Sequence, residues 1–372
     1  MDKDFFPVVL AGGSGTRFWP RSRRNRAKQV LALDGEQTMI QQTIDRLSAL
    51  APHENFWIVT NEALKNIISE QLPQVPEGQI IAEPAARNTA PAIGLAAFIL
   101  ERIAPNAVLA LFPSDQVVAD EAEFRRAVRS AIEVARHGEN VIVMGVPPTR
   151  PETGYGYIEA GGASRSHGEE GVQRVQRFRE KPDLETAKRF VASGNFFWNG
   201  GMFVWSAKTA VALIRRHLPK TAEVLDNIAA AFGTRDFESK LKQFYGHCEN
   251  ISIDYGVMEP LSATGEQSNI YVVRAQFGWN DLGSWTALYE HRIGNSANAQ
   301  HGGNVVEGAG HFELNATGNY VYAPKKFVAT VGVHNVVVVE TDDAILVTTR
   351  DSAQDVSKVV KHLSEKKMTS LI

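Results

Sequence analysis

The sequence contains little of what marks several protein classes. Its 372 residues include one cysteine, Cys248, which excludes an internal disulfide and a thiolate metal site. The longest apolar run, residues 90–100, is shorter than a membrane span and contains Pro91 and Gly94. The N-terminal residues lack the basic flank and apolar stretch of a secretory signal. We therefore expect a cytoplasmic protein that does not enter a membrane.

Charges of the two signs are nearly balanced. The sequence has 39 Lys and Arg against 42 Asp and Glu, a formal net charge of −3. This balance creates no basic field that would attract nucleic acid, so we expect no nucleic-acid partner. Hydrophobic residues make up 44% and charged residues 22%, as in ordinary globular proteins. At about 150 residues per domain, the length predicts roughly two units.

The first 145 residues alternate between apolar strand patterns and helical patterns. Strands are predicted at 6–11, 56–60, 79–82, 107–112 and 141–144, and helices at 38–50, 62–72, 89–103 and 120–137. Such alternation predicts a parallel sheet with helices on both faces. Later segments add strands at 155–159, 171–179 and 270–275, and an aromatic strand at 196–205 that Gly200-Gly201 is expected to break. Further helices are predicted at 184–192, within 207–243 and at 283–291.

A polar stretch at 292–302 is predicted to be a linker. Beyond it, strands are predicted at 320–322, 327–331, 336–340 and 344–347, and a final helix at 352–364. We therefore predict two domains. Residues 1–292 form a large α/β domain that would carry any catalytic site, and residues 303–372 form a small β-rich module with a terminal helix. Because short Val-rich strands leave edges that invite pairing, we hypothesise that this module joins two chains in a homodimer.

The strongest local signal is the loop after the first strand, Leu10-Ala11-Gly12-Gly13-Ser14-Gly15-Thr16-Arg17. Glycines let backbone N–H groups approach a polyphosphate, Arg17 can bind two phosphate oxygens, and Lys28 adds a point charge. The spacing fits neither a dinucleotide fingerprint nor a Walker A loop. The alternative is a structural turn followed by solvated arginines at 21–26. The loop's position at the carboxyl end of a strand favours a phosphate site.

This loop, with Trp19-Pro20 and Lys28-Gln29, resembles the signature of sugar-1-phosphate nucleotidyltransferases, and more narrowly of the mannose-1-phosphate guanylyltransferases. The further matching blocks are EPAARNTAP (83–91), FPSD (112–115), TGYGYI (153–158), FREKP (178–182), WNGGM (198–202) and WNDLGSW (279–285). Two residues depart from the family pattern: Ala27 stands where proline is usual and Gln116 where histidine is common. The C-terminal strands resemble the segment after the catalytic domain in bacterial members. Many members continue into a phosphomannose isomerase domain, and since this sequence stops at Ile372 we do not expect that activity.

The resemblance implies an α/β, Rossmann-like (GT-A-like) fold with a mixed, mostly parallel sheet and a C-terminal β-rich module. It also implies a transferase of GDP-mannose biosynthesis, with GTP and α-D-mannose 1-phosphate as substrates, GDP-mannose and diphosphate as products, and Mg²⁺ as cofactor. Asp115 and Asp281 would hold the metal, and Arg17 and Lys28 would complete the catalytic set. In-line attack on the α-phosphate requires alignment and neutralised charge more than covalent catalysis.

The remaining site residues follow from the same resemblance. The nucleotide would contact Leu10, Ala11, Gly12, Gly13, Ser14, Gly15, Thr16, Arg17, Lys28, Glu83, Asn88, Thr89, Ser114 and Asp115. The sugar phosphate would contact Gly154, Tyr155, Gly156, Glu180, Lys181 and Asn199.

The residues by themselves leave alternatives open. Each aspartate and Asn88 also fit helix N-caps, and Glu180-Lys181 also fits a surface ion pair. Another sugar 1-phosphate (heptose, glucose or fucose) would suit the same fold. A catalytically silent nucleotide-sugar-binding regulatory protein is the third hypothesis, which the presence of every expected cation and carboxylate disfavours.

Overall fold

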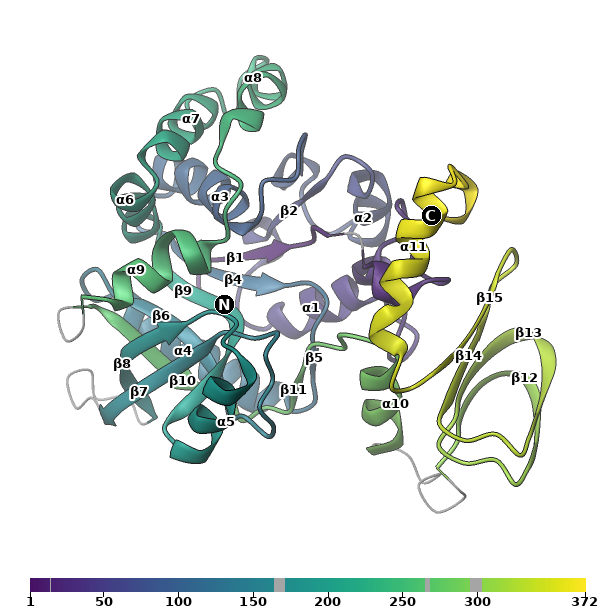
Figure 1. The fold of residues 1–372 in the computed structure, drawn as a ribbon. Coiled ribbons are helices and arrows are strands. Elements are labelled where there is room, and N and C mark those ends of the chain that lie inside the picture. The colour runs from purple at the N-terminus through teal and green to yellow at the C-terminus, as the bar shows by residue number, and fades with distance from the viewer. Residues whose placement is uncertain (14, 164–170, 265–267, 295–302) are drawn as a thin grey trace. The chain divides into compact units, whose positions relative to one another are not determined.

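The computed structural model describes residues 1–13, 15–163, 171–264, 268–294 and 303–372 (Figure 1). Two compact units emerge, each built from discontinuous segments. We call residues 1–12, 44–114 and 118–279 the sheet unit, and residues 13–43, 115–117 and 280–372 the C-terminal unit. Much of the predicted linker lies outside the described residues, and the predicted division at 292 and 303 stays a prediction. The segment after the glycine loop belongs to the C-terminal unit, so these units do not follow the linear order of the chain.

A nine-stranded sheet forms the centre of the sheet unit, in the order β3-β2-β1-β4-β9-β6-β10-β8-β7 (Figure 1). Its strands are β1 (Phe5–Leu10), β2 (Trp57–Asn61), β3 (Ile80–Glu83), β4 (Val108–Pro113), β6 (Val141–Val146), β7 (Tyr157–Ala163), β8 (Val172–Arg179), β9 (Phe196–Ser206) and β10 (Ile270–Arg274). The sheet is mixed, as expected. Parallel pairing joins β3, β2, β1 and β4, and also β6 and β10, whereas β9, β8 and β7 pair antiparallel with their neighbours.

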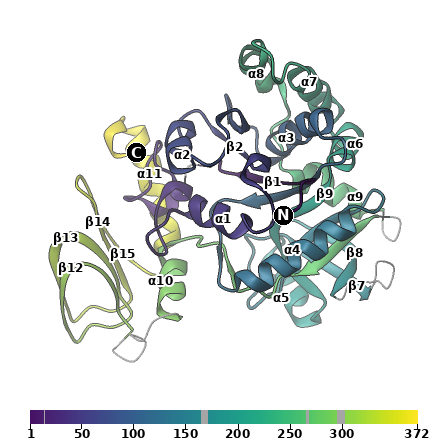
Figure 2. The ribbon, with the colours of Figure 1, turned by 180° about the vertical axis from the view of Figure 1, so that it is seen from behind.

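Helices cover both faces of this sheet. They are α2 (Lys65–Gln71), α3 (Thr89–Ile103), α4 (Glu121–Ala135), α5 (Leu184–Ser193), α6 (Ala207–His217), α7 (Pro219–Ala229), α8 (Phe237–Phe244) and α9 (Glu259–Ser262), while α1 (Met39–Leu47) spans the unit boundary. Helices α3, α6 and α7 lie together on one face, and Figure 2 shows α4 crossing the other. On that second face, the rings of Phe112 and Phe277 lie 5.8 and 5.2 Å from Phe124 of α4.

The apolar run at 90–100 is a core helix. Every residue of that run is buried, because α3 lies between the sheet and the pair α6–α7. A Cβ on Gly94 would lie 2.5 Å from Leu225 and 3.1 Å from Ile214, so glycine allows this close packing. Among the described residues, no helix is both long and apolar enough to cross a bilayer.

Strand β9 is continuous, so the predicted break at Gly200-Gly201 is wrong. The pairing of β9 with β6 instead shifts register between Val143 and Gly145. A Cβ on Gly200 would lie 3.0 Å from the Met144 carbonyl oxygen. The glycine pair therefore permits close approach of the neighbouring backbone without ending the strand.

The C-terminal unit contains a small sheet in the order β12-β13-β14-β15. Its strands are β12 (Val305–Leu314), β13 (Tyr320–Val331), β14 (Val336–Glu340) and β15 (Ile345–Thr349), and its main helices are α10 (Trp285–Gly294) and α11 (Val356–Glu365). The first two pairings are parallel although the connections are short, so the strands stack as turns of a coil. Asn319 bridges successive turns, since its amide donates to Val333 and its Oδ1 accepts from the Val336 N–H.

In this module one strand was missed and one strand prediction was wrong. Strand β12 was not predicted, because Gly308, Gly310 and interspersed polar residues hide any apolar alternation. The two strands predicted at 320–322 and 327–331 form one strand, β13, whose polar middle lies exposed. The predicted terminal helix is confirmed as α11.

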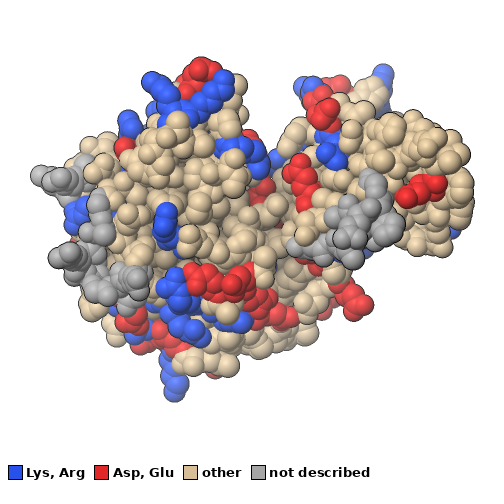
Figure 3. All heavy atoms as spheres, turned by 90° about the horizontal axis from the view of Figure 1, so that it is seen from below, with Lys and Arg blue, Asp and Glu red and all other residues tan. Residues whose placement is uncertain are grey.

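Charged side chains of both signs share the surface. Figure 3 shows Lys and Arg beside Asp and Glu on the face that it draws. Along α4, Arg125 lies 3.0 Å from Glu121, and Arg126 lies 2.7 Å from Glu123. Such exposed pairs contribute little to stability, but this mixing fits the formal net charge of −3.

Candidate active site

The glycine loop begins where β1 ends. Gly13 and Gly15 have φ angles of +89° and +56°, a region that favours glycine. A Cβ on Gly15 would lie 2.7 Å from the backbone nitrogen of Lys28, so only glycine lets the loop lie against this lysine. Predicted nucleotide ligand Ser14 lies outside the described residues. Thr16 begins a short 3₁₀ helix (Thr16–Phe18) that carries Arg17.

The four predicted catalytic residues converge within the C-terminal unit. Lys28 is only 5% exposed, and its Nζ donates to Asp115 Oδ2 at 3.0 Å and to the backbone carbonyl of Asp281. A Cβ on Gly283 would lie 2.9 Å from Asp281 Oδ2 and 3.4 Å from Arg17 Nη1. The buried ammonium of Lys28 thus faces one carboxylate, that of Asp115, and one backbone carbonyl.

The two aspartates fit a divalent cation. Mg²⁺ is commonly held by one or two carboxylates together with substrate phosphates. Within the described residues there is no group of three or more His, Cys, Asp or Glu that could hold a metal alone. The side chains of Asp115 and Asp281 both lie beside cationic groups, Lys28 and Arg17, where phosphate oxygens would complete the ligand set.

A rigid aromatic core positions this cluster. The ring centroid of Trp285 lies 5.0 Å from that of Phe18 and 5.5 Å from that of Tyr320. The indole N–H of Trp285 donates to the Trp19 carbonyl at 3.1 Å, and that of Trp19 donates to the Leu371 carbonyl at 2.8 Å. The segment between Arg17 and Lys28 is therefore held by the C-terminal module.

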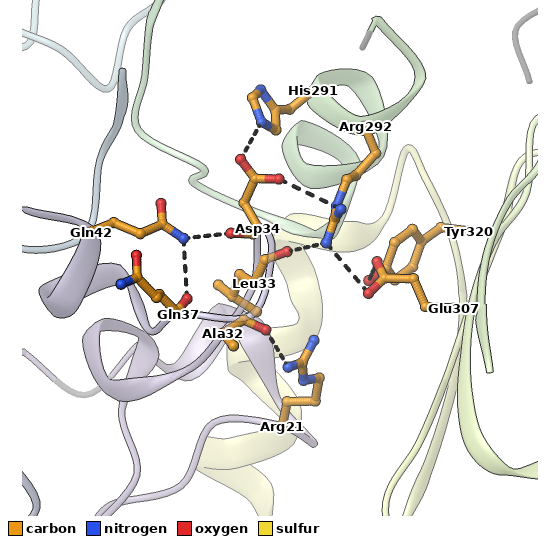
Figure 4. Close-up of polar contacts among 10 residues, drawn as sticks. All are labelled: Arg21, Ala32, Leu33, Asp34, Gln37, Gln42, His291, Arg292, Glu307 and Tyr320. Carbon is orange, nitrogen blue, oxygen red and sulfur yellow. Dashed lines mark hydrogen bonds and ion pairs between the residues drawn. The ribbon is translucent and has the colours of Figure 1, made fainter. Parts of the chain in front are cut away.

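Side-chain contacts also fix the residues that follow Lys28 (Figure 4). Arg21 donates to the Ala32 carbonyl at 2.6 Å, and Arg292 donates to the Leu33 carbonyl at 2.9 Å. His291 lies 2.8 Å from Asp34, and its hydrogen bond lowers the pKa of that carboxyl. The contacts from His291 and Arg292 hold residues 33–34 against α10. The segment that carries Lys28 is therefore fixed on both sides of this lysine.

In the sheet unit, the ends of the parallel strands are tied together. The Ser114 hydroxyl donates to the Leu10 carbonyl at 2.8 Å, and the Thr60 hydroxyl donates to the Ala11 carbonyl at 2.9 Å. Ser114 thus fixes the strand end that leads into the glycine loop. The Leu10 carbonyl also accepts from the Ser114 backbone N–H at 3.1 Å, so two hydrogen bonds join these strand ends.

Glu83 lies beside the start of the loop. A Cβ on Gly12 would be 3.8 Å from Glu83 Oε2, and the Tyr245 hydroxyl donates to Glu83 Oε1 at 2.5 Å. Burial raises the pKa of Glu83 to about 7, against the lowering effect of the Tyr245 hydrogen bond. Asn88 caps α3 through a 2.9 Å bond to the Thr89 N–H, which confirms the N-cap interpretation for this residue. Tyr245 was not predicted, because an isolated tyrosine is indistinguishable from core packing.

A second polar cluster in the sheet unit gathers four of the predicted sugar-phosphate ligands. Lys181 lies 3.0 Å from Glu180 Oε1, and a Cβ on Gly156 would lie 2.5 Å from Glu180 Oε2. Among the described residues, Glu180 Oε2 is buried without a hydrogen-bond partner. The Asn199 N–H donates to the Gly156 carbonyl at 2.8 Å. The cluster therefore offers a carboxylate oxygen without a partner among the described residues next to an exposed lysine.

Asp254 belongs to this cluster and was not predicted. It starts a five-residue π-helix (Asp254–Met258) and accepts from Asn199 Nδ2 at 2.8 Å. Burial and the charge of Glu180 raise the pKa of Asp254 to about 6. Burial lowers the pKa of Lys181, but Glu180 and Asp254 outweigh it and leave that pKa above its ordinary value. The available signal was a single acidic residue in the mostly apolar segment 251–258, since buried acidic residues with shifted pKa values gather at functional sites.

The other two predicted sugar ligands lie on an aromatic wall. The ring of Tyr155 packs edge-on against Trp198 and Trp279, with centroids 5.3 and 5.6 Å away. The Gly154 N–H donates to Glu152 Oε1 at 3.1 Å. Both residues are thus held in place by this wall and its loop.

Comparison with known proteins agrees with this arrangement. Residues 6–295 match the nucleotidyl transferase family, and residues 310–363 match the mannose-phosphate isomerase/GMP-like β-helix domain. The chain is 40% identical to the mannose-1-phosphate guanylyltransferase of Escherichia coli K12, over 96% of this chain and 73% of that protein. It is also 40% identical to the xanthan biosynthesis protein XanB of Xanthomonas campestris, over 97% of this chain and 73% of the relative.

A solved structure is similar over the same length. The crystal structure described as mannose-1-phosphate geranyltransferase from Thermus thermophilus superimposes with a TM-score of 0.84 at 34% identity. The match covers 97% of this chain and 99% of the other. The α/β fold with a C-terminal β-rich module, expected from the sequence, is thereby confirmed. The chain belongs to the nucleotidyl transferase family.

Proposed function

We propose that this protein is a GTP-dependent mannose-1-phosphate guanylyltransferase that uses Mg²⁺. The observation that carries the proposal is Lys28, whose buried ammonium is bound by both Asp115 and the Asp281 carbonyl. This arrangement gathers cations and carboxylates where a triphosphate requires both. The names of the curated relatives support the choice of sugar and nucleotide.

The reaction needs no covalent intermediate. A phosphate oxygen of mannose 1-phosphate forms a bond to the α-phosphorus of GTP, and the bond from that phosphorus to the bridging oxygen breaks. The bond's electron pair leaves with diphosphate. The attacking oxygen is already anionic, so no base is required. Arg17 and Lys28 offset the negative charge that grows on the phosphates, and Mg²⁺ held by the two aspartates would supply further charge neutralisation.

The sugar is selected by hydroxyl contacts in this proposal. Glu180 Oε2, which has no partner among the described residues, accepts a hydroxyl hydrogen bond from the hexose. Lys181 binds the sugar's phosphate, and Asn199 is held beside it by Asp254. A buried acceptor left unpaired costs about 1–3 kcal/mol, so the site discriminates against sugars that lack the matching hydroxyl.

The base is selected by Glu83 in this proposal. The Watson–Crick edge of guanine presents N–H donors at N1 and at the 2-amino group, and an ionised carboxylate accepts both. Adenine presents an acceptor at N1, so this atom and the carboxylate oxygen would repel each other. Glu83 is held by Tyr245 and lies next to Gly12, at the start of the loop.

A substrate panel tests this function. The full chain with Mg²⁺ would be given each of four nucleoside triphosphates with mannose, glucose, fucose or heptose 1-phosphate, and diphosphate release would be recorded. GTP with mannose 1-phosphate is expected to give the highest kcat/KM. A higher value for any other pair would replace the proposed substrates, and binding without turnover would indicate the silent regulatory protein.

Two finer expectations remain part of the proposal. The C-terminal module exposes a set of large apolar side chains on its strands, and we infer that these join two copies of the chain. They are Phe312, Phe327, Val331, Ile345 and Val347. Light scattering of the wild type and of a Phe327→Lys, Val347→Lys variant tests this, since a dimer should dissociate in the variant. We also propose a cytoplasmic location, and fractionation of expressing cells checks it.

A further inference from the structure

The arginines that follow the glycine loop line a cavity that the proposed reaction does not use. The cavity, about 320 Å³, lies within the C-terminal unit between residues 20–31 and residues 322–343. Its charged lining residues are Arg21, Arg23, Arg26, Glu340, Asp342 and Asp343. Arg17, Lys28, Asp115 and Asp281 do not belong to it. The sequence alone suggested only solvated side chains here.

Most of the acidic lining is already paired. Asp343 lies 2.8 Å from Arg23, Asp342 lies 2.6 Å from Lys325, and Glu340 Oε1 is bound by Lys326. The positive charges of the other two lining arginines, Arg21 and Arg26, remain as an excess. This local excess of positive charge favours an anion.

Two buried atoms of the residues that line this cavity have no partners. Among the described residues, Arg21 Nη1 and Glu340 Oε2 are buried and make no hydrogen bond. Arg21 is fixed, since its Nη2 donates to the Ala32 carbonyl (Figure 4). Its guanidinium also lies 4.1 Å from the Tyr322 ring centroid. Glu340 is only 4% exposed. Both residues line the same cavity, and a buried donor or acceptor without a partner is costly unless a ligand completes it.

We propose that this cavity binds a small phosphorylated carbohydrate. Arg21 and Arg26 bind its phosphate, and Glu340 Oε2 accepts a hydrogen bond from a hydroxyl. A volume of about 320 Å³ is at the small end of ligand sites, which suits a monosaccharide phosphate better than a nucleotide sugar. Arg26 precedes Lys28 by two residues. A ligand in this cavity therefore lies next to the catalytic segment and can change the position of that segment.

Hydrogen–deuterium exchange of the full chain tests the site. The probes are mannose 6-phosphate, which has no phosphate at the anomeric carbon, and mannose and inorganic phosphate, each up to about 10 mM, which nearly saturates a site with a Kd of about 1 mM. Mannose 6-phosphate is expected to slow exchange in residues 20–31 and 336–343 more than either simpler probe does. Protection confined to peptides around residues 180 and 199, or equal protection by phosphate or mannose alone, would overturn the proposal.

Charge reversal provides matched variants. Arg26→Glu is expected to weaken binding of mannose 6-phosphate at least about tenfold. Arg24→Glu changes the net charge equally at an exposed neighbour that does not line the cavity, and should leave Kd within about twofold. Equal weakening in both variants would reduce the effect to general electrostatics and refute the site.

The acceptor role is tested by Glu340→Gln. This variant keeps the side chain's shape but replaces Oε2 or Oε1 with an amide donor. Binding of mannose 6-phosphate should weaken at least about fivefold while binding of inorganic phosphate stays within about twofold. Circular dichroism verifies folding, and Arg26→Glu carries the test if this buried variant fails to fold. Unchanged sugar-phosphate binding in a folded Glu340→Gln protein would contradict the proposal.

Discussion

The two units differ in how their buried ionisable side chains are paired. In the C-terminal unit, the buried Lys28 forms an ion pair with Asp115, and the two opposite charges lie 3.0 Å apart. In the sheet unit, Glu83 and Asp254 form no ion pair within the described residues, and burial raises their pKa values to about 7 and about 6. The first arrangement suits fixed charge around phosphates. The second suits carboxylates that exchange hydrogen bonds with neutral groups, and each can be tested by removing its carboxylate.

The largest effect is expected for Asp281→Asn. Turnover should fall about 10³-fold, roughly 4 kcal/mol of barrier, because a metal-binding charge next to Arg17 disappears. Folding should survive, since Lys28 binds the Asp281 backbone carbonyl and Asn280 holds the turn through the Leu282 N–H. Steady-state kinetics with a thermal melt measures both. Near-normal turnover would remove Asp281 from the mechanism.

The next effect concerns stability and pH. The pKa of Asp254 is raised in the folded protein to about 6 from its ordinary value of 3.8. Its stabilising contribution is therefore full below pH 3.8 and is lost as pH rises through about 6, a change of up to about 3 kcal/mol. Denaturant unfolding of the wild type and of Asp254→Asn across this range should show a smaller decline in the variant. Parallel curves would show that Asp254 titrates normally.

A smaller effect is expected at Gly156. Its alanine variant places a Cβ 2.5 Å from Glu180 Oε2, so the carboxylate must move from the sugar. The KM for mannose 1-phosphate should rise at least about tenfold while the KM for GTP stays constant. Gly78→Ala, where a Cβ meets nothing within 4 Å, is the matched control. Equal changes in both Michaelis constants would argue for general misfolding.

The smallest effect is expected for Tyr245→Phe. Loss of the hydrogen bond to Glu83 costs about 1 kcal/mol and raises the pKa of this carboxyl further, since the bond lowers it. The KM for GTP should increase as pH falls below about 7 in the wild type, and this increase should begin at higher pH in the variant. A pH profile of KM checks the shift. Identical profiles would separate Glu83 from base recognition.

The sequence predicted the parts of the molecule that depend on local pattern. Alternating apolar segments indicated most strands and helices, and the glycine loop with Lys28 pointed to phosphate chemistry. It did not predict β12, whose glycines break the alternation, or the roles of Asp254 and Tyr245. Those two residues act through contacts with segments 55 and 162 positions away, at Asn199 and Glu83, and no local pattern encodes such distances.

The hydrogen bond from Trp19 to Leu371 joins residues 352 positions apart. During synthesis the glycine loop leaves the ribosome first, yet its tryptophan gains this partner only after nearly the whole chain has emerged. The segment after the glycine loop therefore gains this hydrogen bond only late in synthesis, and a nascent chain without its last residues would leave the Trp19 indole without this partner.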